Sequence, residues 1–225
     1  MALVLEDIHF TYGDRGFALS VPRLEIAPGE SVALVGPSGS GKTTLLNLIA
    51  GILLPARGTI YLNGENLTAL GGQQRRHQRV RRMGMIFQSF ELLDYLDVRD
   101  NILLQARLAP GVAITAKLEK QAHTIASELG LGDKWRRPIT ALSQGERQRV
   151  AACRALLLNP ALVLADEPTG NLDPANKQAV LDQLISLCKR HDRMLLTVTH
   201  DHSLLPAFDR VIDMAEQLTR PADTA

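Results

Sequence analysis

The feature that most constrains the fold of this chain is a glycine-rich loop between a short apolar run and a stretch with helical character. Residues 36–43 of the 225-residue sequence fit the pattern G-x-x-x-x-G-K-[ST] of a phosphate-binding loop. Glycine lets a phosphate chain approach the backbone N–H groups and permits positive φ angles. The following helix would direct its free N–H groups and its positive dipole end at the anion. The sequence therefore predicts a strand over residues 31–35, a helix over residues 44–50 and a nucleotide phosphate site between them.

The side chains of this loop indicate how phosphates and a metal ion would be held. Lys42 can reach the β- and γ-phosphates, and the Thr43 hydroxyl can bind Mg²⁺. A chance match in a Gly/Ser-rich loop is the alternative, and the flanking strand and helix argue against it. The nucleotide-binding residues predicted in this stretch are Gly36, Pro37, Ser38, Gly39, Ser40, Gly41, Lys42, Thr43 and Thr44.

Two carboxylates follow a second apolar run, at residues 161–165. In P-loop sheets the strand beside the P-loop strand ends with an Asp that holds Mg²⁺, and Asp166 fits that role. Glu167 would point in a different direction and could polarise a water for in-line attack on the γ-phosphate. An acidic turn after a strand would give the same pair of residues. The phosphate-binding loop upstream favours a hydrolytic site instead.

Four further residues are candidates for nucleotide contact. Ser143 has helix-cap character and Gly145 follows it in the first turn, where glycine costs about 1 kcal/mol relative to alanine. An anion facing this helix start would compensate for that cost. His200 follows the last long strand, at the sheet edge where ligands bind in open α/β folds. Tyr12 is either a surface aromatic or a platform for a base, since an aromatic ring can stack on one.

Composition and segment order bound the fold and the possible partners. Strands alternate with helices, which predicts a mostly parallel sheet covered on both faces. Residues 89–141 lack β-branched runs and have apolar residues at helical spacing, so they are expected to form a helical insertion. The insertion would belong to a single domain spanning 1–225, whose core is 1–88 and 142–225.

The net charge of +1 gives no global attraction for nucleic acid. The arginine-rich stretch 75–82 is expected to be the solvated face of a surface helix.

Compartment signals point to a chain that is neither secreted nor membrane-spanning. No apolar run approaches the length that crosses a bilayer. The first ten residues lack the basic and apolar regions of a signal peptide. Cys153 and Cys188 have no metal-type spacing, and both are expected to be small buried hydrophobes in a reducing compartment.

Taken in order, these stretches resemble the nucleotide-binding subunits of ABC transporters over nearly the whole chain. The resemblance adds Gln88 as the Q-loop glutamine, residues 142–146 as the signature and residues 171–173 as the D-loop. It makes Tyr12 the adenine-stacking residue and His200 the switch histidine. Residues 166–173 resemble the macrolide-exporter and lipoprotein-release branch in particular. The signature has Gln144 where the family most often has glycine, which bears on affinity or branch membership rather than on activity.

The resemblance implies a fold and a mechanism. The fold is an α/β P-loop NTPase (RecA-like) core with a mostly parallel sheet, an N-terminal antiparallel β subdomain and an inserted α-helical subdomain. The cofactors are ATP and Mg²⁺, and two copies pack head to tail, so that Ser143, Gln144 and Gly145 of one copy meet the nucleotide of the other. Thr43, Gln88 and Asp166 are the implied metal-binding residues, and Glu167 and His200 the catalytic ones.

The resemblance also implies a membrane partner. The ATPase would drive export or extraction through an integral membrane permease subunit, from the cytoplasmic side of the cell inner membrane. The helical insertion would receive a helix of that subunit in a groove. The candidates for its floor are Phe90, Leu92, Leu93, Tyr95 and Leu96, and ordinary core packing is an equal alternative for any one of them. The alternative is a soluble or regulatory ABC ATPase of cell division, DNA repair or translation. The chain lacks the long coiled coil of the repair members and the second ATPase core of the translation members.

Overall fold

The structure is a computed structural model that describes residues 2–13 and 17–217. Its centre is a parallel sheet with the strand order β6-β7-β8-β3-β9. This order places β3, which leads into the phosphate-binding loop, between β8 and β9, while β7 lies on the other side of β8. The strands are β3 (Ser31–Val35), β6 (Met83–Ile86), β7 (Leu162–Asp166), β8 (Met194–Val198) and β9 (Arg210–Asp213).

A second, antiparallel sheet is formed mostly by the N-terminal strands, in the order β2-β1-β4-β5. Its strands are β1 (Leu3–Thr11), β2 (Ala18–Ile26), β4 (Arg57–Leu62) and β5 (Glu65–Asn66). The last two form a hairpin in which Leu62 pairs with Glu65 across Asn63 and Gly64. Both turn residues have positive φ angles, 53° and 84°, as a two-residue hairpin turn of type I′ requires.

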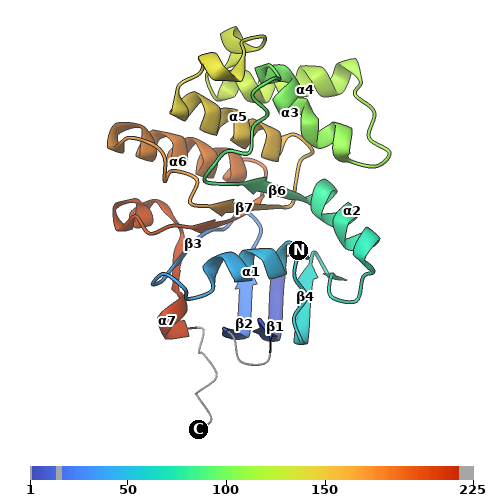
Figure 1. The fold of residues 1–225 in the computed structure, drawn as a ribbon, viewed down its shortest axis with the longest axis vertical. Helices are drawn as coiled ribbons and strands as arrows, with labels where there is room; N and C mark the ends of the chain where they lie inside the picture. Colours follow the sequence, from blue (N-terminus) through green and yellow to red (C-terminus); the bar gives the residue numbers. More distant parts are fainter. Residues whose placement is uncertain (1, 14–16, 218–225) are drawn as a thin grey trace.

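The helices cover both faces of the parallel sheet, as the alternation of segments predicts. Helix α1 lies between the parallel and antiparallel sheets, and α5 and α6 cover the opposite face (Figure 1). The α-helices are α1 (Lys42–Ile49), α2 (Gly72–Arg82), α3 (Val98–Leu108), α4 (Ala116–Glu128), α5 (Gln144–Leu156), α6 (Pro174–Lys189) and α7 (Met214–Gln217). Short 3₁₀ helices are η1 (Gly132–Lys134), η2 (Ile139–Ala141) and η3 (His202–Ala207).

Alternate residues of the central strands belong to two hydrophobic cores. On β7, Val163 and Ala165 pack into the core shared with α3 to α6, whereas Leu162 and Leu164 pack into the core shared with α1 and the antiparallel sheet. Both faces of the sheet are therefore apolar, which explains the uninterrupted hydrophobic runs of these strands. Cys153 and Cys188 are buried in the first core, as expected. Burial raises the pKa of the Cys188 thiol to about 12.

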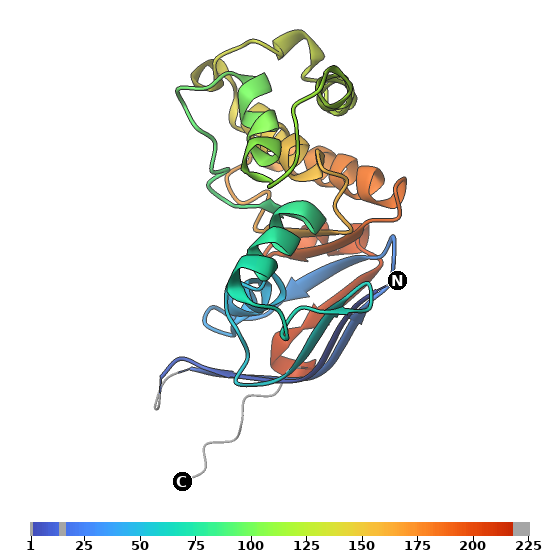
Figure 2. The ribbon, with the colours of Figure 1, turned by 90° about the vertical axis from the view of Figure 1, so that its right-hand side faces the viewer.

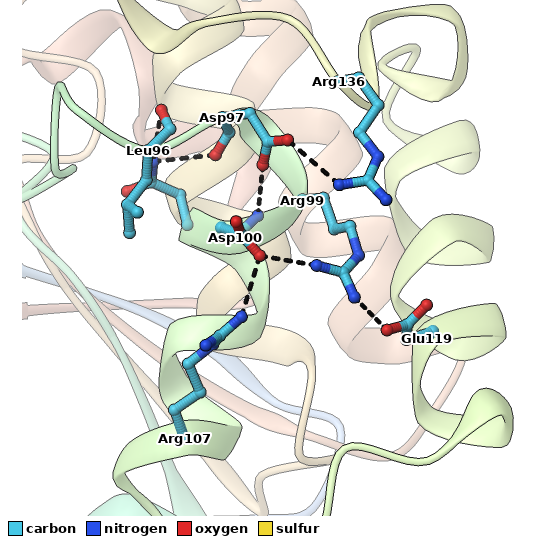
Figure 3. A network of polar contacts seen from close by, with 8 residues as sticks. Leu96, Asp97, Arg99, Asp100, Arg107, Glu119 and Arg136 are labelled. Carbon is cyan, nitrogen blue, oxygen red and sulfur yellow. Dashed lines mark hydrogen bonds and ion pairs between the residues drawn. The ribbon is translucent and has the colours of Figure 1, made fainter.

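The segment between β6 and α5 forms the helical end of the molecule, opposite the antiparallel sheet (Figure 2). Charged side chains connect its pieces (Figure 3). Asp97 caps α3 by accepting a 2.7 Å hydrogen bond from the Asp100 backbone and also pairs with Arg136. Arg99 bridges Asp100 at 2.7 Å and Glu119 on α4. This network fixes α3 against α4 and against the segment that leads to η2.

The arginine-rich helix α2 is exposed, as expected, and its arginines contact neighbouring segments. No residue of α2 is buried. Arg79 donates to the Ala50 carbonyl at 3.1 Å, Arg81 to the Pro110 carbonyl at 3.2 Å, and Arg82 pairs with Glu65 at 2.9 Å. These contacts attach α2 to three segments of its own chain, which accounts for much of the basic run without a nucleic-acid ligand.

The chain as a whole confirms the fold class expected from its sequence. The parallel core, the antiparallel N-terminal sheet and the helical segment after β6 are all present. Helix α1 begins at Lys42, two residues earlier than predicted, because Gly41 with φ 98° ends the loop and starts the helix directly. Within residues 2–13 and 17–217, no helix is both long enough and apolar enough to span a membrane.

Candidate functional site

The phosphate-binding loop connects β3 to α1 and leaves the helix N-terminus open. Gly41 is the N-cap of α1, and no side chain caps the first N–H groups. These groups have no intrahelical acceptors and are available to an anion. Gly41 has a φ of 98°, which strains any residue with a side chain, and a Cβ there would also lie 2.4 Å from the Phe17 ring, so the position favours glycine. Lys42 Nζ folds back over the loop and donates to the Gly36 and Pro37 carbonyls at 2.8 and 2.9 Å.

The predicted metal-binding residues of α1 and β7 meet at the same edge of the sheet. Thr43 Oγ1 donates to Asp166 Oδ2 at 3.1 Å. Hydroxyl and carboxylate oxygens are ligands that Mg²⁺ accepts alongside nucleotide phosphates, so this donor set fits the ion. Burial raises the pKa of Asp166 and Glu167 raises it further, while the Thr43 hydrogen bond and the Lys42 charge act in the opposite direction.

The predicted catalytic residues form a direct pair. His200 Nδ1 lies 3.0 Å from Glu167 Oε1. Glu167 has a φ of 47°, an uncommon value for a residue with a side chain, and its N–H donates to the Val198 carbonyl at 3.0 Å. That hydrogen bond fixes the backbone at the end of β7 to the end of β8. Left-handed residues of this kind concentrate at functional sites.

A cavity of ≈ 410 Å³ joins the loop to the carboxylates. Tyr12 stands in its wall with the side chain 48% exposed, and the Tyr12 ring meets the Phe10 ring edge-on at a centroid distance of 4.7 Å. An exposed aromatic face in the wall of the phosphate cavity fits the predicted adenine platform. The lining residues are Tyr12, Phe17, Ser38, Gly39, Gly41, Lys42, Thr43, Thr44, Asp166, Glu167 and Val198.

The structure places other predicted residues outside this cavity wall. Gln88 follows β6, whose last residue Ile86 pairs in parallel with Ala165, so Gln88 lies at the same sheet edge as Asp166. Ser143 caps α5, accepting from the Glu146 backbone at 3.3 Å while Glu146 Oε2 accepts from the Ser143 backbone at 2.8 Å. This capping lowers the pKa of Glu146. The start of α5 does not line the cavity of its own chain.

Two residues, one in the cavity wall and one paired with the neighbour of His200, carry no recognisable sequence signal. Phe17 lines the cavity and closes the turn after β1, since the Tyr12 N–H donates to its carbonyl at 3.0 Å. Lys177 on α6 pairs with Asp201 at 2.8 Å, directly after His200. Bonds from Lys177 and Ser203 lower the pKa of Asp201 to about 2. Only the pairing of strands and helices brings these residues to the site.

A groove runs between α2 and α3 at the edge of β6. It comprises a cavity of ≈ 280 Å³ and an adjoining cavity of ≈ 480 Å³ that share Val80 and Leu108. The five apolar residues expected to form the floor of a docking groove line neither of these two cavities. Leu92 instead packs against the hydrophobic core, and Tyr95 is 81% exposed. The smaller cavity is lined by Arg79, Val80, Met83, Met85, Phe87, Glu91, Leu104, Gln105, Leu108 and Arg154.

The loop, the Thr43–Asp166 pair and the Glu167–His200 pair on a parallel sheet define a P-loop nucleoside triphosphate hydrolase. Within that class, the family model described as ABC transporter matches residues 19–170, and the chain belongs to the ABC transporter family. It is an ATP-binding and ATP-hydrolysing subunit of that family, as its motifs indicate.

The relatives include ATP-binding proteins of lipoprotein-releasing systems. The chain is 41% identical over 198 residues to LolD of Pseudomonas fluorescens, covering 88% of this chain and 86% of that protein. It is 39% identical over 217 residues to LolD 1 of Rhodopirellula baltica, covering 95% and 94%. These matches confirm the branch that residues 166–173 indicate.

Solved structures agree with the fold. A dimeric, post-hydrolysis structure of the ATP-binding cassette MJ0796 bound to ADP and Pi superposes with a TM-score of 0.81 at 29% identity, covering 94% of this chain and 93% of that one. The cbiO1 structure from Clostridium perfringens, part of the ABC transporter complex cbiONQ, gives a TM-score of 0.86 at 26% identity, covering 97% and 86%.

Proposed function

We propose that this chain hydrolyses MgATP to drive the extraction or export of a lipoprotein-like substrate through a separate membrane subunit. The observation that carries the hydrolytic part is the Glu167–His200 pair beside the phosphate-binding loop. The transport part rests on two relatives, about 40% identical over most of the chain, that are named as lipoprotein-releasing system proteins. The chain would work peripherally, on the cytoplasmic face of the inner membrane.

The chemistry follows from the groups that the cavity brings together. Lys42 and the free N–H groups of α1 would hold the phosphates. Mg²⁺, held by Thr43 and Asp166 with Gln88 at the same sheet edge, would neutralise charge on the phosphate oxygens. Glu167 would accept the proton of the water that attacks the γ-phosphorus, while the bond to the ADP oxygen breaks. His200 would orient the Glu167 carboxylate through its 3.0 Å contact and touch the γ-phosphate.

Two copies would complete each site. Among the described residues, a Cβ at Gly145 would meet only Arg149 Nη1, at 3.7 Å, so packing within this part of the chain gives no reason for glycine there. A phosphate approaching from a second copy gives one. The related MJ0796 cassette is a dimer. We infer that Ser143, Gln144 and Gly145 of each copy face the nucleotide of the other, in a head-to-tail dimer.

The groove between α2 and α3 would receive a helix of the membrane subunit. Its walls combine apolar side chains with Arg76 and Arg79, which suits an amphipathic helix with an acidic position. Leu108 is 61% exposed although it is apolar. Leu108 lines both cavities, so its exposed side chain is accessible to an occupant of the groove.

Copurification from membranes of the source organism tests the transport assignment. Tagged Glu167→Gln protein, loaded with MgATP, is incubated with detergent-solubilised membranes, and bound proteins are identified by mass spectrometry. We expect a membrane subunit with a few spans and a large extracytoplasmic domain. Recovery of only soluble proteins or nucleic acid would favour a regulatory ABC ATPase instead.

A matched pair of substitutions tests the groove. Leu108→Glu should abolish recovery of the membrane subunit while leaving basal ATP hydrolysis unchanged. Val211→Glu is the control, because Val211 is also exposed, at 38%, but lies on β9 at the sheet edge opposite β6. Equal loss of the membrane subunit with both variants would contradict docking in the groove.

A further inference from the structure

One buried arginine of α5 makes contacts that neither the nucleotide site nor the hydrophobic core explains. Arg154 is only 7% exposed. Its guanidinium donates to two backbone carbonyls, that of Phe90 at 2.7 Å and that of Glu91. Burial lowers the pKa of Arg154, and the nearby Glu91 opposes that effect. A buried charge is costly unless hydrogen bonds compensate for it, so these two bonds are needed for the arginine to remain there.

The carbonyls that Arg154 binds belong to a strained turn. Phe90 and Glu91 are consecutive non-glycine residues with positive φ angles, 64° and 51°. Such residues persist only where their surroundings hold them. The Phe90 N–H donates to the Phe87 carbonyl at 3.1 Å, and Ser89 Oγ donates to the Glu91 carboxylate at 2.6 Å. Those two bonds lie within the segment itself. Arg154, on α5, holds the same turn from a different element through its hydrogen bonds to the Phe90 and Glu91 carbonyls.

Gln88 lies between this turn and a second attachment. Its backbone carbonyl accepts a 2.6 Å hydrogen bond from Asn171 Nδ2, in the loop that follows Glu167. A Cβ at Gly170 would lie 3.0 Å from Gln88 Nε2, so that glycine leaves room for the Gln88 side chain. One side of Gln88 is therefore fixed to the loop after β7, and the other to α5 through Arg154.

We propose that Arg154 is a positioning residue that sets the place of Gln88 at the metal site. It does so by holding the Phe90–Glu91 turn against α5, the helix that begins at the signature residues. Arg154 and Glu91 also line the groove between α2 and α3, so an occupant of that groove would touch this attachment. The inference rests on the proposed role of Gln88 in binding Mg²⁺.

Substitution of Arg154, with a second buried arginine as control, tests the inference. Arg154→Met removes both hydrogen bonds. Arg154→Lys keeps the charge and should still hold the Phe90–Glu91 turn in part. Arg193→Met is the matched control. Arg193 is also buried, at 5% exposed, and donates to Asn159 at 2.8 Å, away from Gln88. Both Met variants should lose stability, but only Arg154→Met should alter the Gln88 segment.

Two measurements separate positioning from general stability. The Mg²⁺ concentration that half-saturates binding of a fluorescent ATP analogue should rise about tenfold in Arg154→Met, the size of effect typical for supporting residues of metal sites. Amide exchange of residues 88–92 should accelerate by a similar factor. Arg193→Met should show neither change. If Arg154→Met does not fold, Arg154→Lys must show a smaller rise in the half-saturating Mg²⁺ concentration and a smaller acceleration of amide exchange. The inference is wrong if the Arg154 variants match the Arg193 control.

A Gln88→Ala variant distinguishes this failure from failure of the proposed metal site. If Gln88→Ala leaves the Mg²⁺ requirement unchanged, the metal role of Gln88 is wrong, and with it the positioning role of Arg154. If Gln88→Ala raises the requirement and Arg154→Met does not, only the positioning role is wrong. Tenfold effects in both variants would support the inference.

Discussion

At the scale of single residues, Lys42 is the residue proposed to supply the charge of the phosphate site. In the structure its ammonium donates to two neutral carbonyls of its own loop, at 2.8 and 2.9 Å. Phosphate oxygens would replace these acceptors with stronger charge-assisted ones. Lys42→Ala should therefore weaken MgATP binding roughly tenfold or more, measured by titration calorimetry. Lys117→Ala, on the exposed side of α4, is the control, and unchanged affinity in Lys42→Ala would contradict the phosphate role.

Asp209 gives a pH-dependent prediction at the same scale. Partial burial raises its pKa, but bonds from Lys189, at 2.5 Å, and from Ser31, at 2.6 Å, outweigh this and lower the pKa to about 2. A carboxylate with a depressed pKa stabilises the fold above the pKa of the unfolded chain, and the effect fades as pH falls from about 4 toward 2.

The Asp209→Asn substitution should therefore lower the free energy of unfolding by about 1 kcal/mol at pH 7, because the pair is partly exposed. Urea denaturation at a series of pH values measures the difference from the unchanged chain. That difference should narrow below about pH 4, where the carboxylate of the unfolded chain takes up a proton. A difference that stays constant from pH 7 to pH 3 would show that charge is not its cause.

Some residues of the site could be predicted from sequence and others could not, for a physical reason. Lys42, Thr43 and Asp166 lie in local patterns whose spacing is set by phosphate and metal chemistry. Arg154 has no such pattern. Its two acceptors are 63 and 64 positions away in the sequence, and only the packing of α5 against the segment after β6 brings them together.

At the scale of elements, the buried strands were predictable because both of their faces contact helices or the second sheet. A strand that is covered on both faces must be an apolar run, and β3 and β8 are buried at every position. The groove was not predictable in the same way. Apolar residues follow Gln88 in the sequence, but the groove depends on which faces α2 and α3 turn toward each other, and local periodicity does not specify that.

The contact between β6 and α5 gives a prediction for an element. A Cβ at Gly84 would lie 2.5 Å from the Ala155 carbonyl oxygen, which is helix backbone and cannot move alone. Gly84→Ala should therefore destabilise the chain by about 1–3 kcal/mol, as overpacking does. Gly72→Ala on α2 is the control, since its Cβ would meet only Arg75 Nη2 at 3.8 Å. Thermal and urea unfolding compare the two variants, and equal stability would show that β6 and α5 can separate without cost.

At the scale of the whole molecule, one copy of the chain carries the parts of the proposed site on two separate surfaces. The cavity beside α1 holds the phosphate-binding loop and both carboxylates. The signature residues start α5, which packs against α3 and α4 at the helical end. The proposed head-to-tail pair would join the two surfaces and bury the nucleotide between them. ATP would then be part of the dimer interface, and ATP hydrolysis would let the two copies separate.

Glu167→Gln should make that dimer persist. The amide cannot accept the proton of the attacking water, so ATP binding stays intact while most turnover is lost. Size-exclusion chromatography with light scattering should show twice the mass of one chain in the presence of MgATP, and a monomer without it. Near-normal turnover in Glu167→Gln would refute its role as the base.

A second substitution in that background tests the contribution of the partner copy. Gly145→Asp places a carboxylate where the phosphate of the other copy is proposed to lie, and like charges repel. Within its own chain the change favours α5, because a negative side chain in the first helical turn is stabilising by about 0.3–1 kcal/mol. Glu167→Gln with Gly145→Asp should therefore remain folded and bind ATP as a monomer. A stable ATP-dependent dimer of this double variant would mean that Gly145 does not face the nucleotide of the second copy.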